Sequence, residues 1–102
     1  MASRLDLQTE LETILGTTEV YFQPPPSIKL SYPCIVYSRS SINKQNANDQ
    51  LYKSMNEYEV TVIDPDPESI FADEILAYFP MCRFNRQYIS DNLNHSVLTL
   101  YF

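Results

Sequence analysis

The first hydrophobic positions of the chain follow the period of an α-helix. Four aliphatic residues recur at the spacing of a single helical face, and these are Leu7, Leu11, Ile14 and Leu15. Gly16, the single glycine of the sequence, follows this stretch at the place where helices commonly end in a left-handed residue. The pattern therefore predicts an amphipathic helix over residues 4–15.

A second helical stripe lies in the later half of the chain. Its apolar members are Ile70, Phe71, Ile75, Tyr78 and Phe79. Asp66 is suited to the N-cap, Pro67 to the first helical position, and Pro80 to ending the helix. We expect this helix to begin at Pro67 and to extend to about Phe79.

The other apolar stretches have the patterns of β-strands. Residues 32–38 are apolar on both faces, which is typical of a central strand covered on both sides. Tyr58, Val60 and Val62 alternate with polar residues, so 55–64 reads as a half-buried strand. The remaining predicted elements are a short extended piece at 20–23 and two final strands at 81–89 and 95–102, joined by a turn at 90–94.

Taken in order, these elements predict an α+β fold. The order is α-β-β-β-α-β-β, with a mixed, mainly antiparallel sheet of about four strands and two helices packed on it. The length of 102 residues is that of one domain, so we expect residues 1–102 to form a single unit.

A long polar connection separates the strand at 32–38 from the strand at 55–64. Residues 39–52 contain neither Gly nor Pro, and the stretch is far longer than a hairpin needs. It is either a slack surface loop or a pair of strand extensions forming an arm that a partner holds. If it is an arm, its candidate contact residues are Arg39, Ile42, Lys44, Asn46, Asn48, Gln50 and Tyr52.

Charge narrows the choice of partner. The net charge is −6, so direct nucleic-acid binding is not expected, because that binding relies on neutralising phosphates. Arg83 and Arg86 form a local basic patch on one strand pair, suited to a carboxylate of a partner protein as well as to phosphate. No apolar run approaches a membrane span and the N-terminal stretch lacks an apolar signal region, so we expect no membrane contact and synthesis in the cytosol.

Candidates for chemistry are few. His95 is the single histidine, and without a surrounding motif it reads as a turn or interface residue. Cys34 and Cys82 lie in apolar strands and read as small buried hydrophobes. Asp64 and Asp66 each precede a proline and suit a turn and a cap better than a cation site. We therefore expect no catalytic, cofactor or metal site, and no enzyme.

Tyrosine is abundant, with eight residues in the chain. Several lie near strand ends, Tyr88 among them, and tyrosine is common where protein surfaces meet. The second group of candidate interface residues is therefore Arg83, Arg86, Tyr88 and His95. An acidic α+β domain with a long connection and tyrosines near its surface fits an assembly subunit better than an enzyme.

Four motifs, in their order along nearly the whole chain, resemble the small tail-completion proteins of tailed bacteriophages, also called tail terminators or neck proteins. These motifs are Tyr21-Phe-Gln-Pro-Pro25, Tyr32-Pro-Cys-Ile-Val-Tyr37, Tyr58-Glu-Val-Thr-Val-Ile-Asp-Pro65 and Asp91-Asn-Leu-Asn-His95. None of them is a catalytic signature, so the resemblance depends on their order.

The resemblance implies a virion protein of the tail neck. Such subunits close into a homo-oligomeric ring, usually a hexamer, on the head-proximal end of the tail tube. The ring stops tube growth and offers a joining surface to the head connector, and it also contacts the sheath protein where the tail is contractile. Two alternatives remain at this point: a head-completion or connector protein of the neck, and a small acidic protein-binding module such as an inhibitor.

Overall fold

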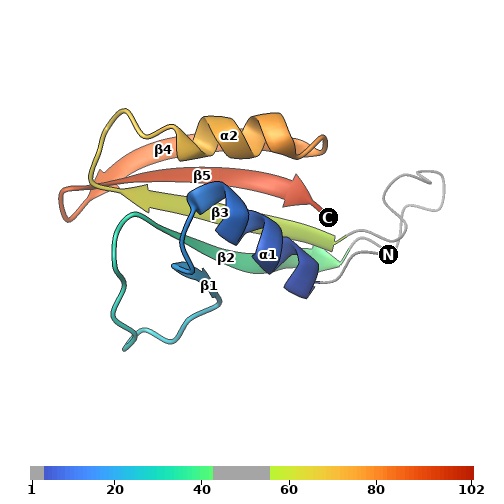
Figure 1. Ribbon diagram of the computed structural model, residues 1–102, viewed down its shortest axis with the longest axis horizontal. Coiled ribbons are helices and arrows are strands. Elements are labelled where there is room, and N and C mark those ends of the chain that lie inside the picture. Colours follow the sequence, from blue (N-terminus) through green and yellow to red (C-terminus); the bar gives the residue numbers. More distant parts are fainter. Residues whose placement is uncertain (1–3, 43–55) are drawn as a thin grey trace.

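The computed structural model describes residues 4–42 and 56–102, and Figure 1 shows a sheet with both helices on the same face. The α+β class and the element order predicted from the sequence are confirmed. The elements are α1 (Arg4–Leu15), β1 (Val20–Phe22), β2 (Cys34–Ile42), β3 (Asn56–Asp64), α2 (Phe71–Tyr78), β4 (Cys82–Ser90) and β5 (Leu93–Tyr101).

The sheet has five strands in the order β1-β2-β3-β5-β4. β1 pairs with β2 in parallel, and every other neighbouring pair is antiparallel. The short strand at 20–22 thus joins the sheet and brings it to five strands, against the expected four or so. Because β5 is inserted between β3 and β4, the two edges of the sheet are β1 and β4 (Figure 1).

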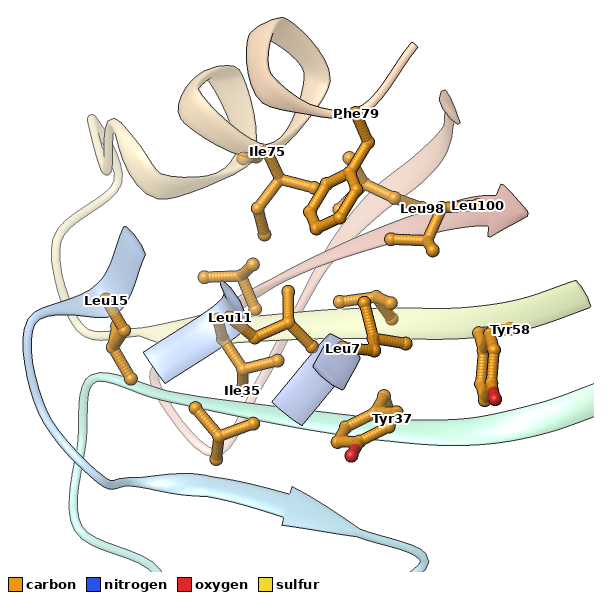
Figure 2. Packing of buried hydrophobic residues seen from close by; sticks show 14 residues of the cluster. Leu7, Leu11, Leu15, Ile35, Tyr37, Tyr58, Ile75, Phe79, Leu98 and Leu100 are labelled. Carbon is orange, nitrogen blue, oxygen red and sulfur yellow. The ribbon is translucent and has the colours of Figure 1, made fainter. Parts of the chain in front are cut away.

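The core lies between the sheet and the two helices, as Figure 2 shows. α1 points Leu7, Leu11 and Leu15 into it, while α2 contributes Ile75 and is followed by the buried Phe79. The central strands of the sheet contribute alternate residues to the same core, and these are Ile35, Tyr37, Tyr58, Val60, Val62, Leu98 and Leu100. The 3.6-residue period of the helices and the two-residue period of the strands therefore meet in one apolar layer.

Strand β2 is covered on both sides at its start, as its sequence predicts. Ile35 and Tyr37 face the helices, and Cys34, on the opposite face, is also fully buried. β2 extends to Ile42, so Arg39 and Ile42 belong to a strand. The rest of the predicted arm, which carries Lys44, Asn46, Asn48, Gln50 and Tyr52, lies outside the described residues.

Helix α2 begins at Phe71, four residues later than predicted, and ends at Tyr78. Ile70 occupies its N-cap position and makes no side-chain capping hydrogen bond. Asp66 instead accepts the backbone N–H of Glu68 at 2.9 Å, which closes a local turn ahead of the helix. The carboxylate oxygen of an Asp can accept a hydrogen bond from a turn or from the first turn of a helix, and that of Asp66 accepts one from a turn.

The turn between β4 and β5 is shorter than the predicted 90–94. Ser90 pairs with Leu93, so that only Asp91 and Asn92 form the loop. Their φ angles of 53° and 62° are both in the left-handed region, as a type I′ hairpin turn requires. Asp and Asn tolerate this region because their short polar side chains hydrogen-bond locally. This tight turn fixes the register in which β4 pairs with β5.

Gly16 offers a test of how α1 is terminated. Its φ is +84°, its N–H donates to Glu12 O at 2.8 Å, and a Cβ at this position would meet no atom within 4 Å. Gly16→Ala is therefore expected to lower the free energy of unfolding by about 1 kcal/mol through backbone strain alone. Gly16→Asn is expected to cost less, because asparagine visits the left-handed region more readily.

Urea denaturation followed by circular dichroism measures both variants of Gly16. An alanine variant as stable as the parent would show that this C-terminal cap does not depend on the left-handed conformation.

Candidate functional site

The β1 edge of the sheet is short and shielded by α1. Gln8 Nε2 donates a hydrogen bond to Val20 O at 2.8 Å, and the guanidinium of Arg4 lies 4.5 Å from the centre of the Phe22 ring. Tyr37 holds the helix in place, because its hydroxyl donates to Gln8 Oε1 at 2.6 Å and accepts from Arg4 at 3.2 Å. The side chains of α1 thus occupy this edge.

The β4 edge is long and open. β4 has nine residues, of which eight are exposed. It contains neither Pro nor Lys, and the edge-protecting features that it does carry are two arginines and one β-bulge. Phe84 is 45% exposed and Ile89 is 72% exposed. An open strand edge with large apolar side chains is a template for association with another chain. The two edges therefore differ in kind, and β4 is the one fitted for contact.

A β-bulge places both arginines of β4 on one face of the sheet. Arg83 pairs with Thr99 and Arg86 pairs with Val97, and those two residues of β5 are two apart and so point the same way. The shift in register between Phe84 and Arg86 makes this possible for residues three apart. Without the bulge, the two guanidiniums would lie on opposite faces.

Asn85, the bulged residue, links Arg83 to the neighbouring strand through two hydrogen bonds. Its Nδ2 donates to Thr99 Oγ1 at 2.6 Å, and its Oδ1 accepts from Arg83 Nε at 3.3 Å. Arg83 is thus oriented by a side chain that is itself bonded to the neighbouring strand.

Tyr88 and His95 form a stacked pair beside the arginines. Their rings are 4.6 Å apart with an interplanar angle of 12°, and the guanidinium of Arg86 lies 5.8 Å from the Tyr88 ring centre. His95 Nδ1 is 3.1 Å from Leu93 O, so the ring nitrogen donates to that carbonyl. The structure therefore brings together four of the predicted interface residues, Arg83, Arg86, Tyr88 and His95, on the helix-free face.

A shallow apolar hollow of about 340 Å³ adjoins this pair. It lies between the loop that follows β1 and the helix-free face of the sheet, and its walls include Ile28, Val36, Ile63, Tyr88 and His95. Tyr88 is the residue through which the hollow reaches β4.

Arg39, another predicted interface residue, lies elsewhere. Arg39 is exposed on β2, a strand separated from β4 by β3 and β5. It does not join the group on β4. Sequence reasoning also missed Phe84 and Ile89, because strand patterns reveal alternation but not which strand will be an edge. The polar run between them, Asn85 to Gln87, is the signal that this strand is incompletely covered.

The other candidates for chemistry are the acidic and thiol side chains. Among residues 4–42 and 56–102, no group of three or more His, Cys, Asp or Glu side chains is placed to hold a metal ion. Asp64 and Asp66 accept backbone N–H groups two residues ahead, in successive turns. Burial raises the pKa of the Cys34 and Cys82 thiols to about 11, and in Cys34 the Glu19 carboxylate adds to the effect.

No family model, no curated protein and no solved structure matches this chain. Within residues 4–42 and 56–102, neither helix has the length and apolar character needed to cross a membrane.

The raised pKa values of the thiols predict slow alkylation. Both lie at about 11 against an ordinary 9.0, so the thiolate fraction near pH 8 falls by about 100-fold relative to an ordinary cysteine. Iodoacetamide labelling read by mass spectrometry should accelerate about tenfold per pH unit up to pH 11. Protein unfolded in urea provides the fast reference, and native labelling as fast as this reference would contradict the burial of the thiols.

Proposed function

We propose that this chain is a structural subunit of a bacteriophage tail that acts as a tail terminator. In this role, copies close into a ring on the head-proximal end of the tail tube, stop tube growth and provide the surface to which the head connector binds. The proposal begins from the order of the four motifs, which resembles that of tail-completion proteins.

The observation that carries the proposal is the open β4 edge. A nine-residue edge strand with exposed Phe84 and Ile89 offers a surface on which another chain can associate. The opposite edge is shielded by Gln8 and Arg4, so the sheet has one edge available for a neighbour. An assembly subunit needs such a surface.

The four motifs support the proposed fold family more than they support the proposed contact through β4. Residues 21–25 include the end of β1, 32–37 the start of β2, 58–65 most of β3, and 91–95 the hairpin turn and the start of β5. They lie mainly in the interior of the sheet, whereas β4 lies outside all of them. The motifs therefore support a fold shared with tail-completion proteins. The exposed β4 edge supports the use of that fold in assembly.

Tail tubes mixed with the purified protein test the proposal directly. Negative-stain electron microscopy should show an added ring at one end of each tube, and tubes assembled in its presence should stop at a defined length. Binding to isolated head connectors without any effect on tubes would favour the head-completion alternative. Binding to neither would reject a role in the neck.

The surface of β4 can be tested with a pair of matched variants. Ile89 is 72% exposed on β4 and Leu5 is 64% exposed on α1, so a Glu at either place should leave the core intact. Ile89→Glu is expected to abolish capping of tail tubes, because it introduces a charge at the proposed contact, while Leu5→Glu is expected to cap normally. Equal capping by the two variants would remove β4 from the proposed interface.

A further inference from the structure

Strand β4 is a basic element of an acidic protein. Between Cys82 and Ser90 the chain has two arginines and no carboxylate, although its net charge is −6. Arg83 and Arg86 share the helix-free face of the strand, and Phe84 and Ile89 are exposed on its other face. A partner that fits the arginine-bearing face of this strand must bring carboxylates.

Residues 66–74, which we call the acidic segment, have the opposite character. The segment includes four exposed carboxylates and neither Lys nor Arg, and the carboxylates belong to Asp66, Glu68, Asp73 and Glu74. Ile70 stands in its middle and is 59% exposed. Within the described part of the chain, the carboxylates of Glu68 and Asp73 make no hydrogen bond or ion pair.

We propose that β4 of one copy docks on the acidic segment of the next copy, in a head-to-tail contact. This inference rests on the proposed function, and it names the two surfaces that join neighbouring subunits. Arg83 and Arg86 meet the carboxylates of Glu68 and Asp73, and the exposed Ile70 of the acidic segment supplies apolar area to the same contact.

Pairing of β4 with β4 of another copy is the main competing arrangement. It would bring four guanidiniums to one boundary with no carboxylate from either strand, and like charges brought close together are destabilising. The carboxylates of α1 are less suited as partners than those of the acidic segment. Glu10 accepts a hydrogen bond from the Tyr78 hydroxyl and Glu12 accepts one from Gln8.

The positions of the two surfaces suit a ring. β4 lies at the edge of the sheet, while the acidic segment leads into α2 in the helix layer above it (Figure 1). The two surfaces are therefore different patches of one subunit, and a contact between different patches is heterologous. Heterologous contacts close into rings when the rotation between neighbours permits it.

Charge reversal tests the contact in the purified protein, by measuring mass with analytical ultracentrifugation. We expect the parent to form an oligomer larger than a dimer. Arg83→Glu with Arg86→Glu, and separately Glu68→Lys with Asp73→Lys, should each raise the dissociation constant by about 10-fold or more. A mixture of these two double variants restores opposite charges at every contact, so it should regain the mass of the parent.

Matched controls separate this contact from a general effect of charge. Glu59→Lys changes an exposed carboxylate on the helix-free face by the same two charges as Asp73→Lys, and it should leave the mass unchanged. Dissociation by Glu59→Lys equal to that by Asp73→Lys would overturn the proposal, and so would a mixture that stays monomeric.

Two outcomes for the parent itself would also overturn the inference. A parent that stays monomeric up to about 1 mM has no such contact between free copies, and a parent that stops at a dimer has a reciprocal contact in place of a head-to-tail one. The capping of tail tubes is measured independently, so a protein that caps tubes while failing this test would keep the proposed function and lose the proposed contact.

Discussion

Burial of one face of the sheet beneath two helices is the constraint on which the rest of the structure depends. α1 inserts Leu7 and Leu11 above the central strands. α2 covers the part of the same face nearer to β4, with Ile75 (Figure 2). Each helix has a single apolar stripe, so together they cover one face of the sheet and leave the other without a helix. The same placement lets α1 shield β1 and leaves the outer edge of β4 open.

The functional side chains proposed for this protein lie on the open β4 edge and not in its interior. In the described residues, Cys34 is buried and Cys82 is half-buried, both with raised pKa values, and Asp64 accepts a backbone N–H in a turn. The exposed chemistry is instead gathered on β4, where a bulge aligns two arginines and a stacked Tyr88–His95 pair adjoins them. Arginine and aromatic side chains are enriched where protein surfaces meet, which is why we propose assembly as the function.

Sequence reasoning succeeded where the signal was local. The period of Leu7 and Leu11 and the position of Gly16 fixed α1 to its observed bounds. Alternation located the strands to within two residues, except that β2 ends at Ile42, four residues beyond the predicted end. The start of α2 was wrong because Asp66 suits a turn as well as a helix, and its oxygen bonds to Glu68 in a turn. A competition between two local structures with the same residue preferences cannot be decided from the residues alone.

The candidate surface was only partly predictable, for a different reason. Arg83, Arg86, Tyr88 and His95 were identified by residue type, yet their common face depends on the bulge and on the pairing of β4 with β5. Which strand lies at an edge is a property of the whole sheet, so the exposure of Phe84 and Ile89 could not be seen in the strand itself.

Hydrogen exchange of the protein bound to tail tubes is the most direct measurement of the central claim, that the β4 edge is the surface through which copies assemble. Amides of residues 82–90 on the open edge should exchange quickly in isolated subunits and slowly in rings on tube ends, because a neighbouring copy excludes water from the strand. The amides of β1 should change little. If rings form on tube ends while exchange in β4 stays as fast as in the isolated subunit, the β4 edge is not the assembly surface.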